Sequence, residues 1–320
     1  MQEARAFIAR KLILGALFFL PQARRIAIER RLRGKQEFRK LQRADWVVIS
    51  WGKSGRTWFR VMLSRFYQVR YDLPSNRLLE FDNLHRMKAD VPRVFFSHNN
   101  YIRDYLNVTD ELDHYRGKKV VLLVRDPRDV AVSQFFQWKY RMLPNKKVLN
   151  KYPPHGSDTG VWQFVTNPDC GIPRIVGFLN SWARAIPMLA HDLLVIRYED
   201  MRKDPHEVMR RVLDFVGTPG TPEEIDKAVE FAAYENMKKL EEKRLFKGSG
   251  ARVKPGDSSN PNSFKVRRAK VGGYRDYFDD RQVAAIDAMV TGKLDPMFGY
   301  NDRSGESVPA DGTPQAGTGG

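Results

Sequence analysis

The sequence predicts an α/β fold of three layers, α/β/α, in which helices cover both faces of a central parallel sheet. Four short runs of apolar and β-branched residues, at 46–50, 93–97, 119–124 and 193–197, have the length and composition of buried strands. Most of these runs are followed by segments with helical character. Strands that alternate with helices form parallel sheets, and ligands bind such sheets beyond the carboxyl ends of the strands.

Helical segments are expected at 57–68, 127–141, 174–190, 205–215 and 223–243. Pro127 and Pro205 suit the first turn of a helix, where the missing N–H of proline costs nothing. Asp204, directly before Pro205, can accept a hydrogen bond from the first turn and so cap its helix. Pro187 lies inside the 174–190 segment and can kink it.

Composition divides the chain of 320 residues into three parts. An Arg-rich, helix-like extension covers 1–44, a main domain covers 45–300, and a tail at 301–320 rich in Gly, Ser, Pro and Thr is expected to be disordered. With 42% apolar residues the main domain can bury one substantial core. Cys170 is the only cysteine, which excludes an intramolecular disulfide and a zinc site of several cysteines and fits a reducing, cytoplasmic location.

The net charge of +17, with a pI near 9.9, indicates an anionic partner. No nucleic-acid-binding motif occurs, so no nucleic-acid partner is expected. The apolar run from Leu12 to Leu20 is shorter than the roughly 20 residues that a membrane-spanning helix needs. Two alternatives remain for residues 1–33, namely a helix packed on the domain or a basic amphipathic segment in contact with an anionic membrane.

A phosphate-binding loop is predicted directly after the first strand, in the residues Gly52-Lys53-Ser54-Gly55-Arg56-Thr57-Trp58. A tight turn from a strand into a helix presents backbone N–H groups and the positive end of the helix dipole, and Lys53 adds a full charge. An ATP-binding Walker loop would have a glycine at position 47, where this chain has Val47 inside the strand. The loop therefore favours phosphate or sulfate binding of another type.

A second group of polar residues follows the third strand, in Arg125-Asp126-Pro127-Arg128-Asp129-Val130-Ala131-Val132-Ser133. Arg125 emerges at the carboxyl end of the strand and can bind a phosphate through two hydrogen bonds, and Ser133 can donate one more. The alternative for Arg125 is an ion pair with a buried aspartate.

These two blocks resemble the motifs of the sulfotransferase family that depends on 3′-phosphoadenosine-5′-phosphosulfate (PAPS). Two further stretches agree, the segment 195–201 that contains Tyr198 and the segment 267–278 that begins with Arg267 and Arg268. The resemblance covers about residues 45–300 and implies the P-loop-type sulfotransferase fold, with PAPS as co-substrate and 3′,5′-adenosine bisphosphate as product. It departs from the family at Arg56, which replaces a threonine, and at Gly273 and Tyr274, which replace aspartate and tryptophan.

The resemblance also implies roles for individual residues. The first loop, from Lys53 through Ser54, Gly55, Arg56 and Thr57 to Trp58, would hold the 5′ phosphosulfate. Arg125, Ser133, Arg267 and Arg268 would hold the 3′ phosphate, and Tyr198 would lie near the adenine. Lys53 would stabilise the leaving oxygen during in-line transfer, and no metal is needed or expected.

The acceptor must lose a proton, and histidine has a suitable pKa of about 6.5. His98 follows the second strand and matches the family's basic histidine, although Phe96 replaces a family lysine; a purely structural role is the alternative. Glu80 is the reserve candidate for the base. The acceptor itself, a hydroxyl or amine of a small molecule, sugar or lipid, cannot be identified, and segment 139–170 is expected to form a flexible lid over it. Two other functions stay open, a nucleotide kinase-like P-loop enzyme and a non-catalytic basic protein at a membrane surface.

Overall fold

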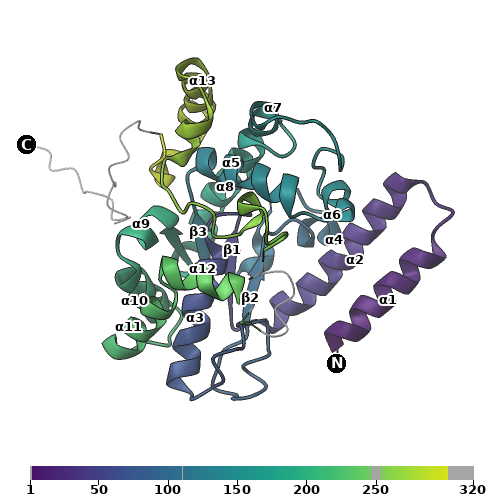
Figure 1. Cartoon of the computed structure of the whole chain (residues 1–320). Helices are drawn as coiled ribbons and strands as arrows, with labels where there is room; N and C mark the ends of the chain where they lie inside the picture. The colour runs from purple at the N-terminus through teal and green to yellow at the C-terminus, as the bar shows by residue number, and fades with distance from the viewer. Residues whose placement is uncertain (1, 110, 244, 247–252, 254, 302–320) are drawn as a thin grey trace, which may run out of the picture.

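The computed structural model describes residues 2–109, 111–243, 245–246, 253 and 255–301. Its centre is a sheet of four parallel strands in the order β2-β1-β3-β4 (Figure 1). The strands are β1 (Trp46–Ser50), β2 (Val94–Ser97), β3 (Lys119–Val124) and β4 (Leu193–Arg197). The predicted parallel sheet is confirmed, and three of its four strands have the predicted bounds.

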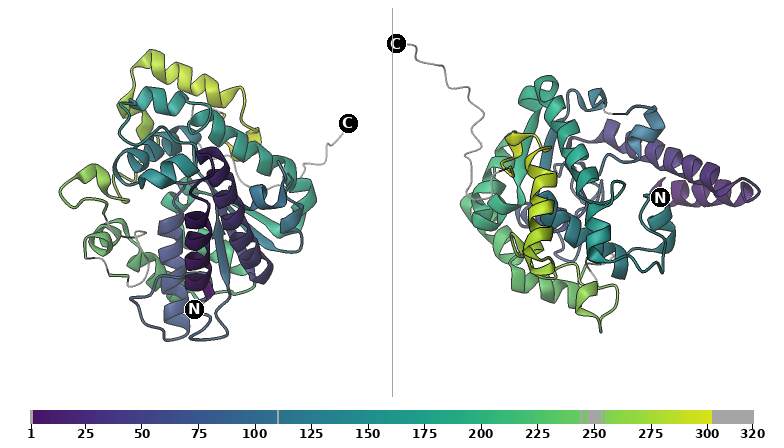
Figure 2. Two further views of the ribbon diagram at one scale, coloured as in Figure 1. Left: turned by 90° about the vertical axis from the view of Figure 1, so that its right-hand side faces the viewer. Right: turned by 90° about the horizontal axis from the view of Figure 1, so that it is seen from above.

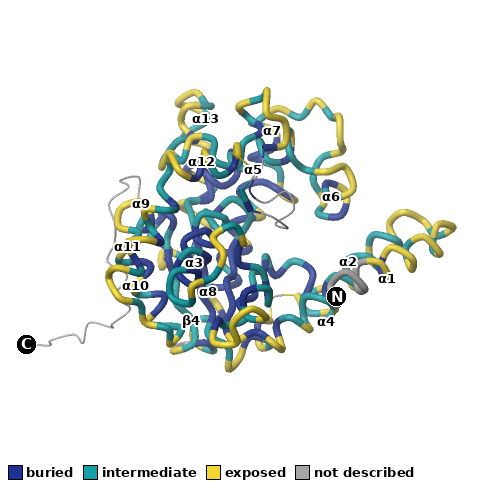
Figure 3. The backbone as a smooth tube through the Cα atoms, turned by 60° about the horizontal axis from the view of Figure 1, so that its bottom comes forward, coloured by how far each residue is buried: buried dark blue, intermediate teal, exposed yellow. Residues whose placement is uncertain are grey.

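Alternation along the strands places a hydrophobic core on each face of the sheet. In β1, Val47 and Ile49 point into one core, whereas Trp46 and Val48 point into the other. Every residue of β1 is buried, as expected of a central parallel strand covered on both faces. Figure 3 shows this buried centre in dark blue beneath exposed helices and loops.

Helices form the two outer layers. The core on the Trp46 side includes residues of α3 (Arg56–Arg70), α9 (Tyr198–Lys203), α10 (Pro205–Phe215), α11 (Pro222–Phe231) and α12 (Tyr234–Glu242). The core on the Val47 side includes residues of α2 (Gln22–Arg43), α4 (Ile102–Leu106), α5 (Pro127–Tyr140), α7 (Val161–Thr166), α8 (Ile172–Leu189) and α13 (Asp280–Thr291). The expected caps are present, because the side chain of Asp204 accepts from the N–H of Glu207 and Pro205 opens α10.

The single helix expected at 223–243 is wrong, because the chain forms α11 and α12 with a break at Ala232 and Ala233. Thr221 and Glu224 form a capping box that starts α11 at Pro222. At Ala233 the backbone turns to an extended conformation (φ −53°, ψ 151°). The carbonyl of Ala232, at the end of α11, accepts a hydrogen bond of 2.8 Å from the indole N–H of Trp58. The break therefore lies beside the phosphate-binding loop.

Segment 139–170, the expected lid, carries more structure than its composition suggested. It contains α6 (Pro144–Leu149) and α7, and the ring of Phe164 is fully buried against Phe135, Trp138 and Cys170. The indole N–H of Trp138 donates to the carbonyl of Pro153 at 2.9 Å. This small core anchors part of the segment, and its mobility over an acceptor stays a prediction.

The first 43 residues form a helical hairpin of α1 (Gln2–Ala16) and α2. The hairpin projects from the body, with the α1–α2 turn at its far end (Figures 1 and 2). None of the described helices is long and apolar enough to cross a membrane. Of the tail predicted at 301–320, only Asn301 belongs to the described residues, and the rest lies outside them.

Candidate active site

A cavity of about 1070 Å³ opens where β1, β2 and β3 end. Eleven of the twelve candidate residues line it, namely Lys53, Gly55, Arg56, Thr57, Trp58, His98, Arg125, Ser133, Tyr198, Arg267 and Arg268. The exception is Ser54, which is 2% exposed and is not among the lining residues. Residues separated by more than 200 positions in the sequence thus meet at one site.

The loop between β1 and α3 has the backbone that a tight phosphate-binding turn requires. Lys53 has φ of 74° and Gly55 has φ of 95°, and both values lie in the left-handed region. A Cβ atom on Gly55 would lie 2.6 Å from Cδ2 of Tyr198, so this position excludes any side chain. The first turn of α3 begins at Arg56 and directs the positive end of its dipole toward the loop.

Arg125 connects the loops that follow β1 and β3. Its guanidinium donates to the carbonyl oxygen of Lys53 at 3.3 Å and lies 4.3 Å from the ring centre of Tyr198. It also pairs with the carboxylate of Asp129 at 3.3 Å. The ion pair considered in the sequence analysis therefore exists, and Arg125 lines the cavity at the same time.

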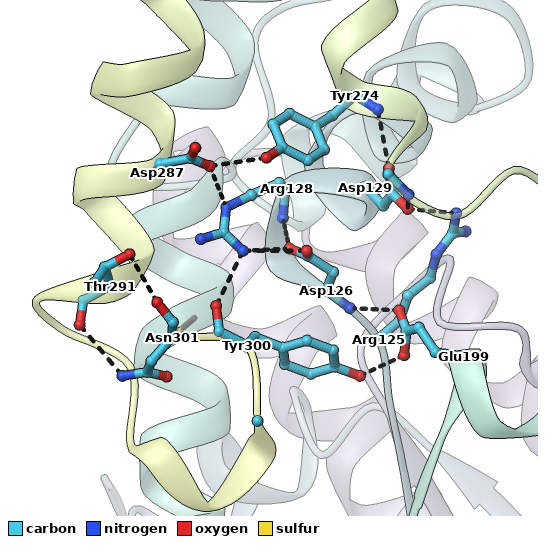
Figure 4. Close-up of polar contacts among 12 residues, drawn as sticks. Arg125, Asp126, Arg128, Asp129, Glu199, Tyr274, Asp287, Thr291, Tyr300 and Asn301 are labelled. Atoms are coloured by element: carbon cyan, nitrogen blue, oxygen red, sulfur yellow. Dashed lines mark hydrogen bonds and ion pairs between the residues drawn. The ribbon is translucent and has the colours of Figure 1, made fainter. Parts of the chain in front are cut away.

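Asp129 fastens the last motif over the cavity. Its two carboxylate oxygens accept hydrogen bonds from the N–H groups of Gly272 (2.9 Å) and Tyr274 (3.0 Å), as Figure 4 shows for Tyr274. Arg125 reinforces the link by donating to the carbonyl of Lys270 at 3.1 Å. These contacts explain how residues 267–274, far away in the sequence, come to line the same cavity as Lys53.

Tyr274, where the family has tryptophan, takes part in a buried polar network. Its hydroxyl donates to Asp287 at 2.8 Å, and Arg128 pairs with the same carboxylate at 2.8 Å (Figure 4). The carbonyl of Tyr300 accepts from Arg128, and the hydroxyl of Tyr300 donates to Glu199. Arg128 and Asp129 thus have a structural role beside Arg125.

Arg267 and Arg268 both lie at the cavity, although they differ in their surroundings. Arg267 stacks 3.8 Å from the ring centre of Phe136 and donates to the hydroxyl of Tyr277. Arg268 pairs with Asp276 at 2.6 Å and is more exposed. Arg267 is therefore held by aromatic side chains, whereas Arg268 is held mainly by an ion pair.

Positive charge is concentrated around Lys53. Burial first, and the charges of the nearby Arg141 and Arg125 after it, lower the pKa of Lys53 to about 7. Burial and the charge of Lys53 also lower the pKa of Lys265 well below its usual value. Cations gathered this closely favour the binding of an anion among them, although Asp129 and Glu241 already pair with Arg125 and Arg141.

Sequence reasoning missed Lys265 and its support. Lys265 lines the cavity, and its backbone N–H donates to the carboxylate of Glu241 at 2.7 Å. Glu241 is fully buried and also pairs with Arg141 at 3.1 Å. Lys265 directly precedes the Val266-Arg267-Arg268 stretch, so its place beside the degenerate last motif was the only available signal.

His98 has the geometry of a proton acceptor. Its Nδ1 lies 2.6 Å from the carbonyl oxygen of Ser50, so Nδ1 carries the hydrogen and Nε2 keeps its lone pair. Nε2 in turn accepts a hydrogen bond of 2.6 Å from Arg56. Burial first, and the charge of Arg56 second, lower the pKa of His98 well below its usual value, so the imidazole is neutral at pH 7.

Glu80, the reserve base, lies in different surroundings. Its carboxylate pairs with Arg60 at 3.3 Å, and Glu80 is not among the lining residues of the cavity. Among the described residues, no cluster of three or more His, Cys, Asp or Glu side chains is arranged to hold a metal ion.

Beyond His98 the cavity wall is polar and carries net positive charge. Arg103, Lys151, Arg174 and Arg184 line it, against the acidic residues Asp104 and Asp169. Asp104 is already paired with Arg30 at 2.8 Å. Asn99 also lines the cavity, is 1% exposed, and its side-chain Nδ2 has no hydrogen-bond partner among the described residues.

Comparisons with known proteins agree with this geometry. The model of the sulfotransferase domain family matches residues 43–298. The chain is 26% identical to cytosolic sulfotransferase 17 of Arabidopsis thaliana over 81% of this chain and 77% of that protein. It is 23% identical to flavonol 3-sulfotransferase of Flaveria bidentis over 83% and 86% of the two chains.

Solved structures share the fold. A mouse sulfotransferase in complex with PAP matches with a TM-score of 0.54 and 21% identity, over 81% of this chain and 89% of that one. A retinol dehydratase in complex with androsterone and PAP matches with a TM-score of 0.51 and 18% identity, over 82% of each chain.

Proposed function

The chain belongs to the sulfotransferase domain family, and on this basis we propose that it transfers a sulfuryl group from PAPS to a hydroxyl or amine of its acceptor. The observation that carries the proposal is the gathering of Lys53, Arg125 and Arg267 around one cavity. PAPS carries about four negative charges when its terminal phosphate is counted as about two. Lys265 and the start of α3 add further positive potential at the same place.

The nucleotide would bind across the carboxyl ends of β1 and β3. Lys53, Gly55, Arg56 and Thr57 would surround the 5′ phosphosulfate, with Ser54 acting through its backbone because its side chain is buried. Arg125, Ser133, Arg267 and Arg268 would hold the 3′ phosphate. The edge-to-face pair of Trp58 and Tyr198, with ring centres 6.0 Å apart, supplies an apolar wall for the adenine.

The transfer would proceed in line. The acceptor oxygen forms a bond to sulfur while the bond from sulfur to the 5′-phosphate oxygen breaks, and Lys53 stabilises the charge on that leaving oxygen. Nε2 of His98 takes the acceptor proton, which requires Arg56 to release it. The products are the sulfated acceptor and 3′,5′-adenosine bisphosphate. Lysine and arginine side chains would neutralise the charge of the nucleotide, so the proposed reaction needs no metal.

The acceptor remains a small molecule, sugar or lipid. The polar wall around Asn99 and Arg174 supports an acceptor with several polar groups over a wholly apolar one. The names of the curated relatives support a cytoplasmic location for this chain. A phosphoryl transfer from ATP, as in nucleotide kinases, is not supported, because the phosphate-binding loop has Val47 where an ATP-binding Walker loop has glycine.

The test is to replace His98 with Ala. After an acceptor screen with labelled PAPS has identified a substrate, turnover of the variant should fall by about 10² or more, because the proton acceptor is lost. Calorimetry should show unchanged binding of 3′,5′-adenosine bisphosphate. Near-normal turnover of the variant would contradict the role of His98. The sulfotransferase assignment would be contradicted if the wild type sulfated none of the acceptors with PAPS and instead transferred a phosphoryl group from ATP in the presence of Mg²⁺.

A further inference from the structure

The helical hairpin of α1 and α2 is firmly attached at one end and projects at the other. Arg30 of α2 donates to Asp104, to the carbonyl of Asn100 and to the carbonyl of Leu149, at 2.7–2.9 Å. A Cβ atom on Gly34 would lie 2.0 Å from the carbonyl oxygen of Tyr101, so α2 lies directly against the body there. The turn between the helices is remote from the body in the right-hand view of Figure 2.

The projecting part exposes large apolar side chains. Ile8 and Leu12 on α1 are 55% and 69% exposed, and Phe18 and Phe19 in the turn are 75% and 68% exposed. Arg10, two residues from both Ile8 and Leu12, donates to Gln36 on α2. Residues two positions apart point to opposite sides of a helix, so the apolar row of α1 faces away from the protein. Several large exposed apolar side chains on one segment indicate an interaction site.

The same hairpin holds most of the excess positive charge of the chain. Residues 1–43 include twelve Arg or Lys and three Glu, which amounts to nine of the 17 net charges. On α2, Arg24, Arg31, Lys35 and Arg39 are exposed and recur at intervals of seven and four residues, which places them on one helical face. An apolar tip beside a basic helix face is complementary to the surface of an anionic bilayer.

We propose that the hairpin docks the protein on a membrane that contains anionic phospholipid, with Phe18 and Phe19 inserted among the acyl chains and the basic face of α2 against the headgroups. A second copy of this chain is the other occupant to consider, and it would bring two strongly positive hairpins together. The proposal does not depend on the enzymatic activity. Arg30 of α2 also lines the cavity. One helix therefore connects the tip that would contact the membrane to the wall of the active site.

Vesicle co-sedimentation of the full chain tests the proposal. In 0.1 M NaCl the protein should bind vesicles of phosphatidylcholine with 30 mol% phosphatidylglycerol, and binding should fall at least tenfold on pure phosphatidylcholine or in 0.5 M NaCl. The double variant Phe18→Ser/Phe19→Ser and the double variant Arg24→Glu/Arg31→Glu should each lose about tenfold or more of the partition coefficient.

Matched control variants lie elsewhere on the surface. Met87→Ser/Met297→Ser removes exposed apolar side chains, and Arg281→Glu/Lys293→Glu reverses two exposed charges near α13. The methionine control should bind vesicles to within about twofold of the wild type. The charge-reversal control should lose less binding than the Arg24→Glu/Arg31→Glu variant, because its charges lie away from the hairpin. Equal binding to the two vesicle types, or equal losses in hairpin and control variants, would overturn the proposal. A dimer seen by sedimentation velocity without lipid, and made monomeric by the phenylalanine variant, would overturn it in favour of self-association.

Discussion

Lys53 is a buried amine whose charge state responds to an anion in the cavity. Its pKa is about 7, because burial and the cations around it disfavour the charged form. At pH 8 about nine-tenths of such a lysine is therefore neutral. A bound phosphosulfate places negative charge beside the amine and raises the pKa again, so binding must take up a proton.

This leads to a prediction about pH. At pH 8, binding of 3′,5′-adenosine bisphosphate should take up about 0.5–1 proton, and affinity should weaken as the pH rises from 7 to 9. Calorimetry in buffers of different ionisation enthalpy measures the uptake. In a Lys53→Met variant the uptake should fall by most of this amount, and an unchanged value there would assign the proton to another group, with Lys265 the nearest candidate.

Arg56 replaces a threonine of the family pattern, and in the structure it contacts His98. The guanidinium of Arg56 occupies the lone pair of His98 that catalysis requires. Arg56 therefore holds the imidazole in its reactive tautomer, and a bound sulfuryl group would offer the guanidinium an alternative partner. From the sequence alone, Arg56 was equally consistent with a side chain in solvent.

At the scale of elements, the turn from β1 into α3 decides whether the phosphate-binding loop can form. A Gly55→Ala substitution must accommodate φ of 95° and a Cβ atom 2.6 Å from Tyr198. We expect a loss of about 1–3 kcal/mol in the free energy of unfolding and at least a tenfold loss of nucleotide affinity. Thermal and calorimetric measurements check this expectation.

Gly292→Ala is the matched control for that substitution. A Cβ atom there would have its nearest neighbour at 3.7 Å, an ordinary contact, and the backbone φ is −85°. The control should change the free energy of unfolding by less than about 1 kcal/mol. If Gly55→Ala and Gly292→Ala change the free energy of unfolding and the nucleotide affinity equally, the left-handed conformation at Gly55 is not required for the phosphate-binding loop.

The elements that the sequence predicted well are those governed by local rules. Continuous apolar runs specified β1, β3 and β4, and the Asp204–Pro205 cap specified the start of α10. The prediction of one helix at 223–243 was wrong. The helix is interrupted at Ala232 and Ala233, where the indole of Trp58 makes a tertiary hydrogen bond to the carbonyl of Ala232. Local periodicity contains no information about such a contact.

The same distinction applies to the candidate site. Residues within contiguous motifs, such as Lys53 and Arg125, could be found from the sequence because a strand end and a loop place them together. Lys265 could not, because its position depends on the buried carboxylate of Glu241, and no motif links these two residues. Ser54 was expected in the loop that holds the 5′ phosphosulfate, and burial of its side chain leaves its backbone as the part that could contact the ligand.

At the scale of the whole molecule, the cavity is lined by segments between residues 30 and 277, and hydrogen bonds hold the last of them in place. Asp129 holds the Gly272–Tyr274 turn, and Arg128 with Glu199 holds Tyr300 near the end of the described chain. These contacts position the segment that carries Arg267 and Arg268 beside the cations that follow β1 and β3. Such preorganisation reduces the ordering cost of binding.

The central claim is that this one cavity recognises an adenosine phosphorylated at both the 5′ and the 3′ position. Calorimetric titration of the wild-type protein with 3′,5′-adenosine bisphosphate and with 5′-AMP tests it most directly. We predict micromolar or tighter binding of the bisphosphate and affinity at least 100-fold weaker for 5′-AMP, because the partners of the 3′ phosphate lose their ligand. Equal affinity for the two nucleotides, or no binding of the bisphosphate, would contradict the account.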